Sequence, residues 1–139
     1  MQAPPITLDG VAKTFHGRGR AVEALRSVDL AVAGGEFVSL LGPSGCGKST
    51  LLRIIGGLQD ATAGVVSIGP LAPDAARADR QFGLVPQSPA LVPWKTVAQN
   101  VRFLSTLHRG HVSHPTLSDA EIAELLATVG LAPFVDAYP

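Results

Sequence analysis

Hydrophobic and polar residues alternate along the first part of the chain. Residues 6–15, ITLDGVAKTF, show the alternation of a half-buried strand. Residues 21–32, AVEALRSVDLAV, end with apolar side chains at a period of two and predict a second strand. Between them, FHGRGR predicts a basic loop broken by glycines. Residues 36–41, EFVSLL, are almost continuously apolar, which is typical of a strand buried on both faces of a sheet.

The pattern becomes helical after a glycine-rich turn. Residues 49–58, STLLRIIGGL, predict a helix that ends at its two glycines. Residues 96–110 place four apolar side chains on one helical face and end at a glycine. Ser118 and Glu121 form a capping box, which predicts a further helix closed by Gly130.

The stretches between these helices predict short strands and loops. AGVVSIGP, residues 63–70, predicts a short strand bounded by glycines, and the polar residues 71–80 predict a loop. QFGLVPQ predicts a buried strand that stops at Pro86. Residues 88–95, SPALVPWK, predict a proline-rich loop. Strands that alternate with helices indicate an α/β fold.

The glycine-rich turn carries the clearest chemistry. Residues 42–49, called the phosphate loop below, match G-x-x-x-x-G-K-[ST] at every fixed position. Its glycines allow left-handed backbone angles, so successive N–H groups point inward and form an anion nest. The dipole of the following helix faces the same point. An ordinary glycine turn is the alternative, but a full match between a predicted strand and a helix favours a nucleoside triphosphate.

Each polar residue of the turn has a predicted role. The ammonium of Lys48 reaches the terminal phosphates, the hydroxyl of Ser49 enters the shell of Mg²⁺, and Thr50 bonds a phosphate nearer the sugar. The predicted nucleotide contacts in this turn are Gly42, Pro43, Ser44, Gly45, Cys46, Gly47, Lys48, Ser49 and Thr50. Beside Lys48 and a helix N-terminus Cys46 gains reactivity, but a small residue at a variable position is the simpler interpretation.

Bulk composition favours one globular domain. The chain has 139 residues, 46% of them hydrophobic, with 11 basic and 11 acidic side chains. This balance gives no field that favours nucleic acid. One cysteine cannot form an internal disulfide, the start lacks the pattern of a signal peptide, and no apolar run approaches a membrane span. We therefore expect a soluble intracellular protein.

Four stretches together resemble a known family. They are VAKTF, VEALRSVDLAVAGGEFVSLLGPSGCGKSTLLRIIGGL, GLVPQSPALVPWKTVAQNV and LLATVGL. The chain resembles the ATP-binding domain of an ABC transporter, and more narrowly the nitrate, sulfonate or taurine importers. The resemblance implies a phosphate-loop NTPase core with an N-terminal antiparallel β subdomain over about 1–90. The start of a helical subdomain would follow over about 91–139, and the cofactors would be ATP and Mg²⁺.

The resemblance also implies roles for residues outside the turn. Phe15 would stack on adenine and Val22 would add an apolar contact, although Phe15 could also be a core or edge-strand aromatic. Gln87 would bind Mg²⁺ and orient the attacking water, so that Lys48 and Gln87 form the catalytic set. Without the family pattern, Gln87 would be an ordinary polar residue at a strand end.

The partners are implied in the same way. Residues 87–94 would contact a transmembrane permease subunit, with Trp94 as an apolar anchor, or Trp94 could instead lie in the core. ATP would join two copies of the domain head to tail. The protein would then be cytoplasmic and peripheral at the inner face of the cell membrane.

The sequence departs from the family in its later part. No run of four apolar residues is followed by Asp-Glu, no LSGG signature occurs, and the switch histidine is missing. PFVDAYP is the nearest stretch, but Pro133 interrupts it and no glutamate follows Asp136. We therefore expect a domain that is truncated before the signature, binds ATP weakly and hydrolyses little of it.

Other functions stay open from the sequence alone. A kinase uses the same loop, although the basic segment FHGRGR precedes the loop instead of following it as a lid would. A remnant that only binds nucleotide is a further alternative. His108, His111 and His114 have a spacing that could bind zinc, but no cysteine or carboxylate lies close to them in sequence, so metal binding there is disfavoured.

Overall fold

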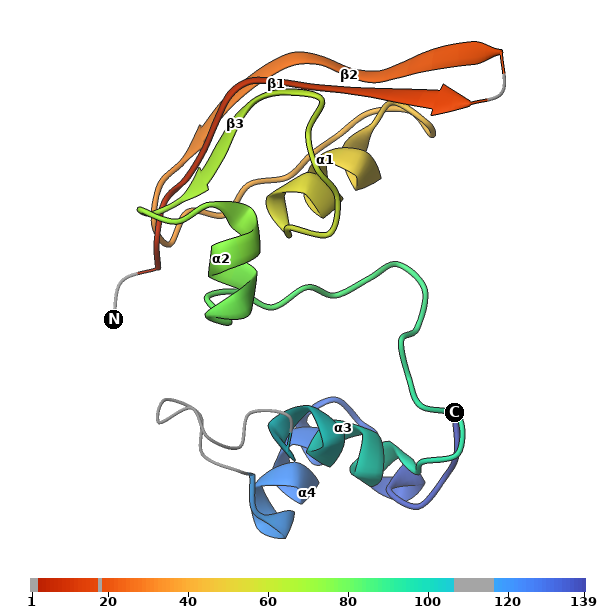
Figure 1. The fold of residues 1–139 in the computed structure, drawn as a ribbon. Coiled ribbons are helices and arrows are strands. Elements are labelled where there is room, and N and C mark those ends of the chain that lie inside the picture. The colour runs from red at the N-terminus through yellow and green to blue at the C-terminus, as the bar shows by residue number, and fades with distance from the viewer. Residues whose placement is uncertain (1–2, 18, 107–116) are drawn as a thin grey trace. The chain divides into compact units, whose positions relative to one another are not determined.

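The computed structural model describes residues 3–17, 19–106 and 117–139 (Figure 1). The chain divides into two compact units, Met1–Val85 and Pro86–Pro139. Each unit is described by itself. The histidine-rich segment lies outside the described residues, and no described helix has the length and apolar character that a bilayer crossing needs.

The first unit contains a three-stranded antiparallel sheet. Its strands are β1 (Ile6–Gly17), β2 (Arg20–Val32) and β3 (Ala63–Ile68), in the order β2-β1-β3 (Figure 1). This confirms the N-terminal antiparallel sheet and all three of these predicted strands. The predicted loop FHGRGR is wrong over most of its length. His16 pairs with Ala21, so the ladder continues to the hairpin end and satisfies the backbone there.

Side chains of the sheet build the core with helix α1 (Lys48–Ile55). Leu8 and Val11 on β1 are buried, and they pack in one cluster with Leu51 and Ile54 of α1. Leu8 and Val11 lie three residues apart, and the irregular register between them brings both to the same face of the sheet. The spacing of three on the helix places Leu51 and Ile54 on one side of α1. The predicted helix is confirmed and ends at Gly56, its C-cap residue. This packing fixes the start of α1, and with it the phosphate loop, against the sheet.

Residues 71–80, expected to be a loop, contain helix α2 (Pro73–Ala78). Pro73 occupies the first helical turn, where a missing N–H costs nothing, and Asp74 complements the helix dipole. Ala76 is fully buried, so tertiary packing adds to the helix propensity of the alanines. The polar residues of this stretch led to the prediction of a loop, although the stretch contains a short helix with one buried side chain.

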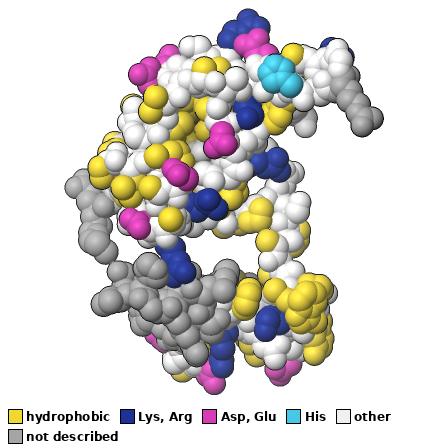
Figure 2. Space-filling view, in the orientation of Figure 1, with side chains coloured by type: hydrophobic (Ala, Val, Ile, Leu, Met, Phe, Trp, Pro, Cys, Tyr) yellow, Lys and Arg dark blue, Asp and Glu magenta, His cyan; other side chains and the backbone are white. Residues whose placement is uncertain are grey.

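Two predicted strands are wrong. Residues 36–41 and residues 81–87 have no strand assignment, and no described strand pairs with either. Phe37 and Leu41 are each 92% exposed, while Leu40 packs partly against the core. Apolar composition alone makes no strand, because the backbone also needs a neighbouring strand to bond. Figure 2 shows hydrophobic side chains, in yellow, open at the surface of both units.

The second unit contains α3 (Val97–Thr106), α4 (Asp119–Thr128) and the short 3₁₀ helix η1 (Ala132–Phe134). The first amides of α3 donate to carbonyls that follow η1: Val97 N to Ala137 O at 2.9 Å and Ala98 N to Val135 O at 3.1 Å. The end of the described chain thereby caps the start of α3.

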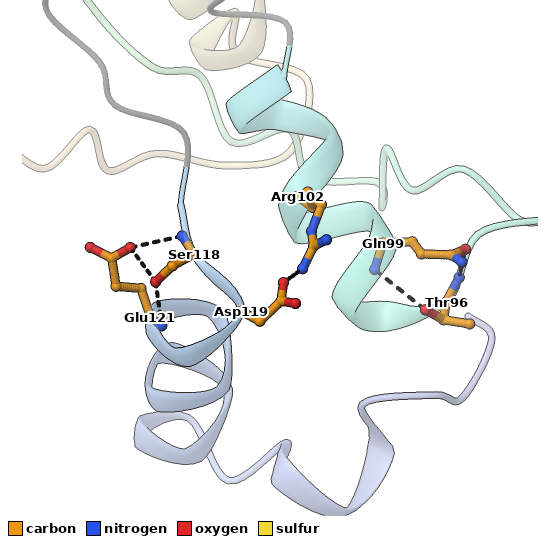
Figure 3. Close-up of polar contacts among 6 residues, drawn as sticks. All are labelled: Thr96, Gln99, Arg102, Ser118, Asp119 and Glu121. Atoms are coloured by element: carbon orange, nitrogen blue, oxygen red, sulfur yellow. Dashed lines mark hydrogen bonds and ion pairs between the residues drawn. The ribbon is translucent and has the colours of Figure 1, made fainter.

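The predicted capping box of α4 is present. Ser118 accepts the backbone N–H of Glu121, and the Glu121 carboxylate accepts the backbone N–H of Ser118 (Figure 3). At the other end Gly130 has φ 73°, and Leu131 N donates to Leu126 O at 2.7 Å, which closes the helix as predicted.

Candidate nucleotide-binding site

The phosphate loop lies against strand β2. Gly45 and Gly47 have φ values of 82° and 98°, the left-handed region where a side chain is strained. A Cβ added at Gly47 would lie 2.5 Å from Ala24 O and 2.8 Å from Leu25 Cδ2. Position 47 therefore needs glycine for two reasons, its backbone angle and its close approach to β2.

Lys48 closes the loop on itself. Its Nζ donates to Gly42 O at 2.7 Å and to Pro43 O at 2.8 Å, and it lies 3.4 Å from the Sγ of Cys46. The ammonium is thus held inside the curve of the loop by the main chain. This arrangement places one positive charge beside the main chain of the loop.

The start of α1 adds donors to this positive charge. Gly47 is the N-cap residue and supplies no side-chain cap, and no acidic residue lies in the first turn. The first backbone N–H groups of a helix have no partner within the helix. Together with the Lys48 ammonium they can bind several oxygens of one phosphate chain. Ser49 is exposed and Thr50 is half-buried in the same turn, so two hydroxyls accompany these donors.

An aromatic and an aliphatic side chain lie side by side on the sheet near this loop. Phe15 of β1 pairs in register with Val22 of β2, and these residues are 41% and 52% exposed. The alternative of a core aromatic is therefore wrong for Phe15. Val22 lies two residues from Ala24, the contact of Gly47, which is about 7 Å along a strand. The loop and this apolar pair therefore lie at neighbouring positions of β2.

An ion pair lies next to Val22 on β2. Arg26 donates to the carboxylate of Glu23 at 2.7 Å and holds the pKa of Glu23 below its ordinary range. Glu23 follows Val22 on β2, so this carboxylate is already paired with a cation.

Gln87 and Trp94 belong to the second unit. Gln87 is exposed and lies outside any helix or strand, so its predicted place at a strand end is wrong. Trp94 is 76% exposed, which excludes the alternative of a core tryptophan. Within the described structure the loop, Phe15 and Val22 lie in one unit, whereas Gln87 is described with the other.

Sequence reasoning missed Asn100, which holds the loop that carries Trp94. Its side-chain oxygen accepts the N–H of Val92 at 2.8 Å, and its amide nitrogen donates to Lys95 O at 2.9 Å and Thr96 O at 3.0 Å. Asn100 is the one buried polar residue among those described. A polar residue on the helical face predicted to be apolar was the only signal in the sequence.

Comparison with known proteins identifies the family of the chain. The ABC transporter family model matches residues 25–139. The aliphatic sulfonates import ATP-binding protein of Xanthomonas axonopodis pv. citri is 44% identical over 100% of this chain and 52% of its own length. The sn-glycerol-3-phosphate import ATP-binding protein of Rhizobium meliloti is 41% identical over 96% of this chain and 37% of its own length. The chain spans about half the length, or less, of these curated relatives.

Solved structures support the fold independently. An ATP-binding cassette solved as a dimer in a post-hydrolysis state with ADP and Pi superposes with a TM-score of 0.80 at 32% identity. The match covers 96% of this chain and 61% of that cassette. From the match over residues 25–139, the likeness of fold and the phosphate loop itself, the chain belongs to the ABC transporter family, as an ATP-binding cassette.

Proposed function

We propose that the chain binds ATP with Mg²⁺ at the phosphate loop and serves as the ATP-binding part of an ABC importer. One observation carries the proposal: Lys48 is held inside a loop that touches β2 within two residues of the exposed Phe15–Val22 pair. The loop would bind the phosphates and the pair would bind the adenine. The names of the relatives favour transport over the kinase that the loop alone would allow.

The divalent cation would be held by oxygen ligands. Mg²⁺ prefers hard oxygen donors and keeps several waters. The exposed hydroxyl of Ser49 lies next to Lys48 in the first turn of α1 and fits this preference. The amide oxygen of Gln87 would join it. Bound Mg²⁺ would neutralise charge on the phosphates, while Lys48 orients their terminal oxygens.

The partner would be a transmembrane permease that contacts residues 87–94. Trp94, Leu91 and their neighbours expose an apolar surface, and Asn100 fixes the loop that presents it. A second cassette would complete the ATP site, as the dimeric structure of the similar cassette suggests. The protein would then lie at the inner face of the membrane through the permease.

The solute would be nitrate or a sulfonate such as taurine. The sulfonate relative matches the full length of this chain, and the resemblance to that group rests on the same stretches. Selection would occur in the permease. These 139 residues contain no Asp-Glu pair after an apolar run, so we expect slow hydrolysis by them.

Calorimetry with Mg·ATP tests the proposal. Lys48→Ala removes the charge-assisted contact to the phosphates, and we expect affinity to fall about ten- to a hundred-fold. Lys95→Met, a lysine of the other unit, is the matched control and should leave affinity unchanged. If Lys48→Ala binds Mg·ATP as tightly as the original chain, the proposed site is wrong.

A further inference from the structure

The ammonium of Lys13 lies over the aromatic ring of the candidate site. Lys13 lies on β1 two residues before Phe15, and its ammonium lies 5.4 Å from the centroid of the Phe15 ring. The same Nζ donates to Asp60 O at 2.6 Å. Lys13 is half-buried, so it is held between a ring face and a carbonyl instead of extending into water.

The carbonyl that holds Lys13 belongs to a segment fastened to β1. Thr62 N donates to Ala12 O at 2.8 Å, and Thr14 N donates to the hydroxyl of Thr62 at 3.0 Å. This segment follows α1, the helix that the phosphate loop opens. The contact between Lys13 and Asp60 therefore links the position of the Phe15 ring to the element that carries the phosphate donors.

We propose that Lys13 is a positioning residue for the nucleotide base, an inference that rests on the proposed ATP site. Its ammonium fixes the Phe15 ring from one side and leaves exposed ring surface for adenine. A cation over one face of a ring draws π density toward itself. The ring surface away from Lys13 then stacks better on an electron-rich purine. Lys13 thereby contributes to binding of the base and not of the phosphates.

Two probes separate these contributions. Mg·ATP contains the base, whereas Mg·tripolyphosphate contains only the phosphate chain. For Lys13→Met we expect affinity for Mg·ATP to fall about two- to five-fold, with affinity for tripolyphosphate unchanged. Lys13→Arg keeps a cation over the ring and should restore ATP binding. An equal loss for both probes, or no loss for ATP, overturns the proposal.

A matched control and a double mutant sharpen the test. Lys95 lies over the ring of Phe103 at the same 5.4 Å in the other unit, so Lys95→Met should change neither affinity. In a Phe15→Leu background, Lys13→Met should weaken ATP binding by less than about 1.5-fold. A full loss in that background would show that the ammonium acts elsewhere and would refute the proposal.

Folding and the parent proposal are checked separately. If Lys13→Met loses its β-sheet signal in circular dichroism, Lys13→Gln, which keeps a donor for Asp60 O without the charge, replaces it with the same expected split. If Lys48→Ala leaves both probes bound normally, the ATP site itself is wrong. If Lys48→Ala abolishes binding of both probes while Lys13→Met weakens binding of neither, the ATP site is supported and only the proposed role of Lys13 is wrong.

Discussion

Residues 6–17 pair with residues 20–32 along most of their length, whereas residues 36–41, which are more continuously apolar, pair with no described strand. The difference lies in where each segment finds its partner. A hairpin strand pairs with a strand only a few residues away, so closing the loop between them costs little conformational entropy. A strand of a parallel sheet depends on a partner beyond a crossover of a dozen residues or more.

Amide hydrogen exchange would test this comparison with the largest expected effect. The amides of Leu8 and Val11 lie in the central strand of the sheet, and those of Val38 and Leu40 lie outside any strand. We expect the first pair to exchange about a thousand-fold more slowly, because their opening approaches global unfolding. Comparable protection at Val38 and Leu40 would mean that residues 36–41 are paired after all.

Two valine substitutions test the same contrast by stability. Val11 is fully buried, so Val11→Ala should lower the free energy of unfolding by about 2 kcal/mol through lost burial and a residual cavity. Val38 is 41% exposed, and Val38→Ala removes the same atoms at a cost within about 0.5 kcal/mol. Urea denaturation of both variants measures the difference. Equal losses would remove the distinction between the paired and unpaired segments.

The success of the sequence predictions depends on the same difference between local and distant partners. The turn from Gly42 to Thr50, the hairpin strands and the capping box of Ser118 and Glu121 were predictable because local rules determine them. The strand at residues 36–41 was not, because its state depends on a partner elsewhere in the chain. Local composition therefore predicts mainly contacts that are made locally, and β3 is the exception, because its short run bounded by glycines predicted a strand although its partner β1 lies far away in sequence.

The missed residues of the candidate site have a similar explanation. Lys13 contacts Asp60, 47 residues away, and no pattern in the sequence of β1 predicts that contact. Asn100 looks like one polar interruption in an amphipathic helix until the preceding loop folds back onto it. Both side chains gain their roles from backbone carbonyls, whose positions only the tertiary structure supplies.

The start of α4 offers the smallest and most local test. A hydrogen bond from Ser118 holds the pKa of Glu121 below the ordinary glutamate range. Because the folded value is the lower one, the carboxylate stabilises the fold above the unfolded pKa and stops doing so as pH falls through the folded pKa. Urea denaturation should show the original chain slightly more stable than Glu121→Gln at about pH 7, with the difference lost as the pH falls through the folded pKa of Glu121.

Glu124 supplies the control for this titration, because it lies on the same helix outside the capping box. Glu124→Gln should show less change with pH relative to the original chain than Glu121→Gln does. The two glutamates lie three residues apart and are both exposed, so a general effect of lost negative charge would appear in both variants. An effect confined to position 121 would instead place the pH dependence in the reciprocal bonds with Ser118, the most local contact that the sequence predicted.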